Sequence, residues 1–338
     1  MIAPDPSFAH VSRMTDEHGM FEHADHTTPR PEHGYCTDDM ARLLVVTSRE
    51  PNPSPVVLAL AKSALRFLAD AQGVSGDVCS RMNRRGRWQG RRSVEDSWGR
   101  SLWGFGTAAA RSPHDWLRQD ALSRFERGAK RRSPWPRAMA FAALGADEVL
   151  VARPGHRGAL SILADTADVV GHAGGDRSWP WLEARLSYAN AVLPDAMIAA
   201  GTALDRQPLV AEGLELLSWL LEHESIGGHL SVTPAGGSAP GDAQPAFDQQ
   251  AIEVATLADA CARAWSVTQD VRWVDGIASA VGWFLGDNDA NAAMFDSSTG
   301  GGYDGLHHDG PNLNEGAEST LALISTLQHA RHLVPAAA

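Results

Sequence analysis

Two kinds of helical segment alternate along this chain, and this alternation is the feature that most restricts its fold. Segments of one kind carry a single apolar stripe at helical spacing, as in Leu58, Ala61, Leu65 and Leu68. Segments of the other kind, such as SLWGFGTAAA and AMAFAALGA, are apolar on nearly all sides. A one-sided stripe indicates a helix with one wet face, whereas a helix that is apolar all round is buried. The sequence therefore predicts an all-α protein in which inner helices alternate with outer ones.

The inner helices recur as members of helical hairpins. Their predicted starts, roughly 40 to 70 residues apart, lie near Asp38, Glu95, Trp135, Asp195, Asp248 and Glu315. One hairpin cannot bury its own apolar face, so such pairs stack, and a chain of 338 residues can form one closed domain. We expect a single (α/α)6 toroid over residues 1–338. Only five outer stripes are visible, so the last partner is missing or is supplied by residues 1–34, which we expect to pack on or over the cavity.

The connections between these helices fall into two length classes. Connections from an inner to an outer helix are mostly short, as in REPNPSP and RSPHD. Connections into the next inner helix are mostly long, and they span residues 73–94, 174–193, 225–247 and 287–314. In a closed ring the two classes lie on opposite rims, and long structured loops are usually functional. We therefore expect the functional site on the rim that carries the long loops and the inner-helix starts.

Acidic residues are concentrated at this rim. They are doubled or repeated at three helix starts, in Asp38 and Asp39, Glu95 and Asp96, and Glu315 and Glu318. A single acid at a helix start can be explained by capping and by the helix dipole. Crowded acids repel one another, unless a site uses the repulsion to raise a carboxyl pKa. Cleavage of a glycosidic bond needs one carboxylic acid and one carboxylate, so the pattern favours that chemistry.

Aromatic and amide side chains on the same rim suit a sugar ligand. The chain has 11 tryptophans against 3 tyrosines, and flat aromatic rings with a polar handle can lie against sugar rings. Tryptophan also supplies packing area, which is our interpretation for those inside helices, such as Trp103. The predicted substrate-binding residues are Tyr35, Glu95, Trp98, Trp135, Trp179, Trp181, Glu183, Tyr188, Asn190, Gln249, Glu253, Asp304, His307, Asn314 and Glu315.

Composition argues against several other classes of protein. A net charge of -12 would repel a phosphate backbone, so nucleic acid is not an expected partner. No run of about 18 apolar residues and no signal-peptide pattern is present, so we expect no membrane span. Three scattered cysteines suggest neither disulfides nor a metal site and fit a cytoplasmic location.

No cofactor or metal is expected from the motifs. The glycine-rich stretch at 300–302 follows no strand and matches no nucleotide-binding pattern. His18, His23 and His26, with Asp16 or Glu22, could ligate a metal, but the alternative is a polar loop that closes over the cavity.

The chain resembles the six-hairpin glycosidase superfamily, whose (α/α)6 toroids include unsaturated glucuronyl hydrolases and many inverting glycoside hydrolases. The motifs GYCTDDMAR, EDSWGR, SPWPRAMAFAALG, FDQQAIE and NLNEGAESTLA are also similar to a bacterial group encoded beside, or fused to, glycosyltransferases. The resemblance implies a sugar in the funnel and a possible glycosyltransferase partner. The catalytic residues it implies are Asp38 or Asp39, Asp96, Asp248 and Glu318.

Three hypotheses about function follow. The first is a glycoside hydrolase-like enzyme that acts on an oligosaccharide or glycoside with a pair of rim carboxyl groups. The second is a noncatalytic carbohydrate-binding accessory protein that works with a glycosyltransferase. The third is another chemistry in the same toroid, such as sugar epimerisation, because a fold does not determine a function.

Overall fold

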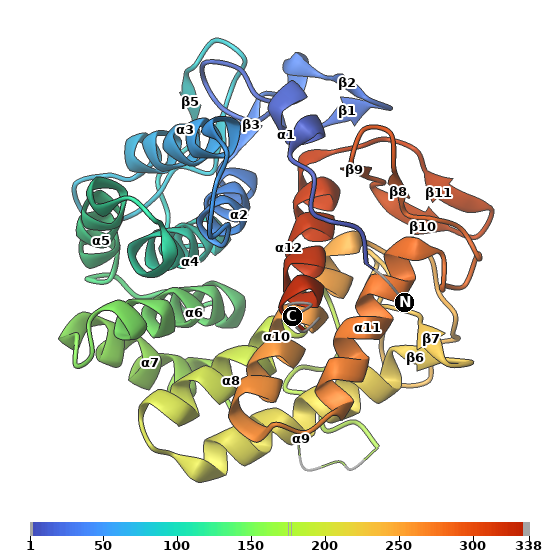
Figure 1. Ribbon diagram of the computed structural model, residues 1–338. Helices are drawn as coiled ribbons and strands as arrows, with labels where there is room; N and C mark the ends of the chain where they lie inside the picture. Colours follow the sequence, from blue (N-terminus) through green and yellow to red (C-terminus); the bar gives the residue numbers. More distant parts are fainter. Residues whose placement is uncertain (1–2, 175, 177, 334–338) are drawn as a thin grey trace, which may run out of the picture.

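The computed structural model describes residues 3–174, 176 and 178–333, most of which lie in helices or in the loops between them (Figure 1). The helices are α1 (Ala9–Arg13), the 3-10 turn η1 (Pro31–His33), α2 (Thr37–Ser48), α3 (Pro55–Ala71), α4 (Asp96–Arg111), α5 (Asp115–Gly128), α6 (Pro136–Ala152), α7 (Arg157–Val170), α8 (Val192–Ala203), α9 (Gln207–His223), α10 (Ala251–Thr268), α11 (Arg272–Leu285) and α12 (Ala317–Leu333). No helix among the described residues is long and apolar enough to cross a membrane.

Six of these helices form an inner ring, and the others surround it. The inner helices are α2, α4, α6, α8, α10 and α12, each in contact with the next, and α12 contacts α2 to close the ring (Figure 1). The helices α3, α5, α7, α9 and α11 pack outside. Each inner helix begins within about three residues of its predicted start. The predicted all-α class and the (α/α)6 toroid are therefore confirmed.

The N-terminal segment closes the ring beside the last inner helix. Helix α1 contacts α12, and the buried His10 ring lies 2.8 Å from the Glu315 carbonyl oxygen through Nε2. The backbone N–H of Ala317 donates to the carbonyl of Glu22 at 3.1 Å. These contacts place parts of the N-terminal segment against α12, and its role as the sixth outer partner stays a prediction.

Glycines let neighbouring inner helices approach at backbone distance. A Cβ atom at Gly99 or Gly106 of α4, or at Gly145 of α6, would collide with a backbone carbonyl of the facing helix. The lack of side chains there, together with the many alanines of α6, brings the helix axes close. This explains why the inner segments are rich in small residues and apolar on all sides.

Short antiparallel strands hold the long loops on the rim. They form the sheets β1–β2, β3–β4–β5, β6–β7, β8–β9 and β10–β11. Their bounds are β1 (Ala24–Asp25), β2 (Thr28–Pro29), β3 (Tyr35–Cys36), β4 (Arg81–Met82), β5 (Trp88–Gln89), β6 (Ser225–Ile226), β7 (His229–Leu230), β8 (Phe295–Asp296), β9 (Gly301–Gly302), β10 (Gly305–His307) and β11 (Gly310–Asn312). Because β3 ends where α2 begins and pairs with β4, it ties loop 73–94 to the start of an inner helix.

Candidate functional site

The paired aspartates at the start of α2 bind side chains rather than cap the helix. No side chain caps the N-terminus of α2. Asp38 accepts a hydrogen bond from Ser97 Oγ at 2.5 Å and lies 3.3 Å from Arg100 Nε. Asp39 accepts from Arg42 Nη1, one helical turn further on, at 2.5 Å. Asp38 therefore links α2 with α4, whereas Asp39 contacts an arginine of its own helix. The charge of both carboxylates still suits the helix dipole.

Arg42 joins the first and last inner helices. Its Nη1 contacts Asp39, and its Nη2 contacts Glu318 Oε2 of α12 at 2.5 Å. The side chains of Arg42 and Asp39 are nearly inaccessible, whereas that of Glu318 is 41% exposed. One buried guanidinium thus holds two carboxylates from opposite ends of the sequence, one of them open to solvent.

The N-terminal segment adds a further acid to this group. Oxygen and sulfur atoms of Glu22, Cys36 and Asp39 lie within 4.8 Å of one another. Glu22 is also ion-paired with Arg81 of loop 73–94. Burial raises the pKa of the Cys36 thiol well above its ordinary value, so this sulfur stays protonated and is a poor metal ligand. The group is better described as an acid cluster neutralised by arginines.

The local environment raises the pKa of Asp39 to about 7. Burial is the largest cause, Arg42 opposes it, and the charges of Glu318, Glu22 and Asp38 add to the increase. At neutral pH this carboxyl group is therefore partly protonated beside other acids. A pair of carboxyls with separated pKa values is the arrangement that acid–base catalysis requires.

These side chains surround a cavity of about 330 Å³ on the long-loop rim. Its walls come from the N-terminal segment, loop 73–94, the starts of α2, α10 and α12, and loop 287–314. They consist of Glu22, His23, Cys36, Asp38, Asp39, Arg42, Arg81, Gln250, Ala251, Asp304, Gly316, Glu318 and Ser319. We call this the acidic cavity.

A second cavity of about 340 Å³ lies on the same rim, at the starts of α4 and α6. Its walls are Glu95, Asp96, Trp135, Pro136, Arg137, Glu183 and Tyr188. The Tyr188 hydroxyl donates to Asp96 Oδ2 at 2.7 Å, and the Arg137 guanidinium lies 4.8 Å from the centre of the Tyr188 ring. We call this the aromatic cavity. Asp38, in the wall of the acidic cavity, accepts a hydrogen bond from Ser97, the residue that follows Asp96 in the chain.

The structure divides the predicted catalytic residues between these cavities. Asp38, Asp39 and Glu318 line the acidic cavity, and Asp96 lines the aromatic one. Asp248 lines neither, and its carboxylate instead lies 3.8 Å from the His307 ring. Four of the predicted acids thus line one of the two rim cavities, and their catalytic role stays a prediction.

Seven of the predicted substrate-binding residues are buried in the structure. Those that are almost completely buried are Tyr35, Trp98, Trp181, Asn190, Gln249, Glu253 and Glu315. Glu253 accepts the backbone N–H of Asn190 at 3.0 Å, and Gln249 Oε1 accepts from Trp283 Nε1 at 3.1 Å. These two polar side chains accept hydrogen bonds from buried N–H groups, because buried donors need partners. None of the seven is among the residues that line the acidic or the aromatic cavity.

The remaining predicted residues occupy intermediate positions. Trp179 packs edge-on against Trp219, with ring centres 5.2 Å apart, and Asn314 accepts the backbone N–H of His26. Neither lines a rim cavity, and the same holds for His307. Glu95, Trp135, Glu183, Tyr188 and Asp304 do line one. Trp135 is the single tryptophan in the described walls of the two rim cavities, and it lies in the aromatic one.

Sequence reasoning missed three residues of the acidic cavity. Arg42 and Arg81, which form ion pairs with its acids, were not predicted. Glu22 was considered only as a metal ligand. A signal was available for Arg42, because it lies three residues after Asp39 in TDDMAR, on the same helix face. No local signal marks Glu22 or Arg81, which reach the cavity through loop packing.

Comparisons with known proteins bear on the fold. No protein-family model and no curated protein matches the sequence. A sugar epimerase from a ruminal bacterium superposes with a TM-score of 0.71 at 12% identity, covering 97% of this chain and 96% of that one. A D-mannose isomerase gives 0.67 at 10% identity, with coverages of 96% and 95%.

A cellulase of C. cellulolyticium in complex with cellobiose gives a TM-score of 0.64 at 8% identity and covers 94% of this chain and 88% of that one. Identities this low establish a shared fold and nothing finer. The chain therefore shares its (α/α)6 toroid fold with these proteins.

Proposed function

We propose that this protein is a carbohydrate-active enzyme that cleaves a glycosidic bond in the acidic cavity, with Asp39 as the general acid. The observation that carries the proposal is the environment of Asp39. Its carboxyl group lines the cavity, is partly protonated at neutral pH, and has a Glu22 oxygen within 4.8 Å. Like-charged neighbours and burial are the usual means by which enzymes keep such an acid protonated.

In the proposed reaction Asp39 donates its proton to the leaving glycosidic oxygen. A second carboxylate, Glu22 or Glu318, accepts a proton from a water molecule whose oxygen bonds to the anomeric carbon. Arg81 forms an ion pair with Glu22, and Arg42 forms one with Glu318. The aromatic cavity supports the proposal, because Trp135 and Tyr188 are 57% and 44% exposed and offer flat faces to a further sugar ring.

The test is product release from a panel of mannosides and glucosides by the native protein and by Asp39→Asn, Glu22→Gln and Glu318→Gln variants. Loss of the general acid should lower turnover by roughly 100-fold or more. Turnover of the native protein should fall as the pH rises above about 7, because Asp39 then loses its proton. Asp309→Asn, at a fully exposed carboxylate, is the matched control.

Full activity in Asp39→Asn would contradict this assignment. Sugar binding without any turnover by the native protein would instead support the accessory role beside a glycosyltransferase. Each variant should keep the native circular dichroism spectrum, so that a loss of activity can be assigned to chemistry.

A specific observation favours sugar epimerisation as a second candidate. The sugar epimerase matches along 96% of its own length, against 88% for the cellulase and 73% for a glycoside hydrolase family 9 endoglucanase. His23 also lines the acidic cavity, and an imidazole side chain is a common general base in enzymes. Incubation of disaccharides in D2O separates the two reactions, because epimerisation by proton transfer leaves deuterium on a sugar carbon and hydrolysis does not.

A further inference from the structure

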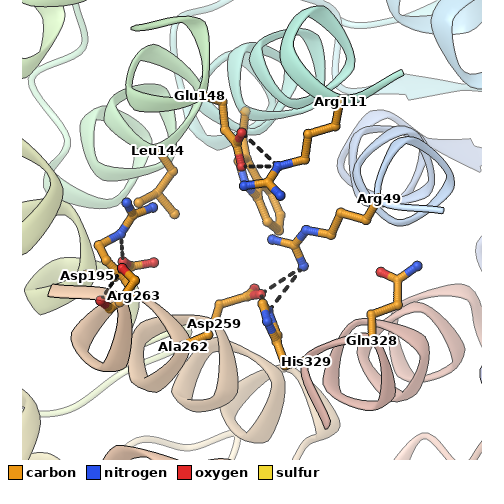
Figure 2. A pocket seen from close by; sticks show the side chains of 12 residues that line it. Arg49, Arg111, Leu144, Glu148, Asp195, Asp259, Ala262, Arg263, Gln328 and His329 are labelled. Atoms are coloured by element: carbon orange, nitrogen blue, oxygen red, sulfur yellow. Dashed lines mark hydrogen bonds and ion pairs between the residues drawn. The ribbon is translucent and has the colours of Figure 1, made fainter. Parts of the chain in front are cut away.

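A third cavity lies at the opposite end of the ring, where the inner helices finish (Figure 2). Its volume is about 220 Å³. Arg49 follows the last residue of α2, Arg111 is the last residue of α4, and Gln328 and His329 lie in the last two turns of α12. None of its lining residues is shared with the acidic or aromatic cavity. We call it the distal cavity.

The charges in the distal cavity compensate one another. Arg49 Nη1 donates to Asp259 Oδ1 at 2.9 Å, and Arg111 Nε lies 2.8 Å from both oxygens of Glu148. Arg263, the third arginine in the walls, pairs with Asp195 and with Asp147. Three arginines are thus matched by acids, and the inner-helix C-termini add partial negative charge. Such an environment does not favour a strongly charged ligand of either sign.

Two arginines nevertheless keep donors that no described residue uses. Arg49 bonds described residues through Nη1 alone, which leaves Nε and Nη2. Arg111 bonds them through Nε alone, which leaves both terminal nitrogens. Figure 2 shows the two guanidinium groups pointing into the cavity from α2 and α4. Each offers a pair of N–H groups in a planar fork.

Gln328 offers an acceptor to the same space. Its Nε2 donates to Val46 O at 2.8 Å and to Glu50 Oε1 at 2.5 Å, which identifies the other atom as the oxygen. The residue is 1% exposed, and its Oε1 has no hydrogen-bond partner among the described residues. Figure 2 shows this oxygen on the cavity side. A buried acceptor without a partner is unusual in a folded protein and indicates a group that binds there.

Trp103 completes the wall with an apolar face. It lines the distal cavity, and the Arg49 guanidinium lies 5.8 Å from the centre of its ring. An aromatic ring beside planar polar side chains accommodates the C–H face of a ring compound while its hydroxyls reach the polar groups.

We propose that the distal cavity binds a small neutral polyhydroxylated ligand of about monosaccharide size. A hydroxyl group both donates and accepts, so one ligand can donate to Gln328 Oε1 and accept from Arg49 and Arg111. The volume is below the roughly 300–1,000 Å³ of pockets for drug-sized molecules. An anion would face Glu148, Asp259 and the helix C-termini. The proposal concerns binding and does not depend on the reaction at the opposite rim.

The test uses the full chain labelled with 5-fluorotryptophan and the 19F resonance of Trp103, assigned with Trp103→Phe. The probes are D-glucose, D-mannose, D-galactose, myo-inositol and inorganic phosphate. We expect a saturable shift of this resonance with at least one of the four polyhydroxylated probes. Ser266→Trp, at an exposed residue that lines the distal cavity, should weaken that binding by about tenfold or more.

Val267→Trp is the matched control, because this residue is 40% exposed and does not line the cavity. It should leave the affinity unchanged. No shift with any polyhydroxylated probe would overturn the proposal, as would an equal affinity in Ser266→Trp, or a response to phosphate alone. Because the readout is at Trp103, an absence of turnover at the rim leaves the outcome of this test unaffected.

Discussion

A single buried carboxyl, Glu224, shows how strongly burial in this protein changes the pKa of one residue. Glu224 is 1% exposed. Its Oε1 accepts the backbone N–H and the hydroxyl of Thr233, while its Oε2 has no partner among the described residues. Burial, and then the charge of Glu253, raise its pKa. The acid is therefore protonated in the folded protein at pH values where an exposed glutamate is ionised.

This shift predicts a loss of stability with rising pH. The folded pKa of Glu224 exceeds the unfolded value of about 4.3, so its contribution is complete below that value and is lost as the pH rises through the folded pKa. In Glu224→Gln the fall in the free energy of unfolding between pH 5 and pH 8 should be smaller by about 1–3 kcal/mol. Urea unfolding at both pH values measures it.

Glu222→Gln, at a less buried position of the same chain segment, serves as the control. It should leave the pH dependence as in the native protein. An identical pH dependence in Glu224→Gln and the native protein would show that the buried carboxyl does not take up this proton on folding.

At the scale of elements, the contact between α4 and α6 depends on residues without side chains. Gly106 and Gly145 face each other, and a Cβ on either would meet the backbone of the facing helix. Backbone cannot move aside as a flexible side chain can, so the two helices would have to separate. The closeness of the inner helices thus rests on a few glycines that composition alone would describe as helix-destabilising.

Gly145→Ala should therefore destabilise the protein, although alanine is the better helix former. We expect the free energy of unfolding to fall by about 1–3 kcal/mol from overpacking, measured by thermal or urea unfolding. Gly236→Ala is the control, because that glycine has no neighbour within 4 Å of a new Cβ and no positive φ. Its effect should stay within about 0.5 kcal/mol. A stabilised Gly145→Ala protein would refute the close approach.

At the scale of the whole molecule, the toroid is closed by contacts between distant parts of the chain. Arg42 and Glu318 join α2 to α12, and His10 of α1 lies against Glu315. The acidic cavity lies at this junction, and its walls include Glu22 and His23 of the N-terminal segment as well as Glu318 of α12.

His10→Ala should loosen the closure. The side chain is completely buried, and its loss leaves a cavity and removes the contact with the Glu315 carbonyl. We expect a loss of about 2–4 kcal/mol in the free energy of unfolding and faster amide exchange at the start of α12. His308→Ala, at an 83% exposed side chain, should change neither quantity. Unchanged exchange at α12 in His10→Ala would show that the N-terminal segment does not hold the ring closed.

The pattern of residues along the chain predicted most of the architecture. The period of apolar residues identified the inner and outer helices, because a helix buried on all sides and a helix with one wet face have different compositions. Loop lengths identified the rim that carries the acidic cavity. Acids repeated at helix starts identified Asp38, Asp39, Asp96 and Glu318, since one-dimensional spacing is enough to place a residue at a helix start.

The sequence by itself therefore determined which helices are inner and which are outer, and the order in which they follow one another around the ring. It also determined the rim on which the acidic cavity lies. Only the tertiary structure decided which polar residues face a cavity. Like Asp39, Glu253 and Gln249 are polar residues near the start of an inner helix, yet they form hydrogen bonds with buried groups. Glu22 and Arg81, in contrast, reach the acidic cavity from loops. The same is true of the distal cavity, whose residues lie in, or directly after, all six inner helices without a local motif. The physical reason is that a side chain's neighbours in a closed ring are set by contacts across the ring, which local spacing does not encode.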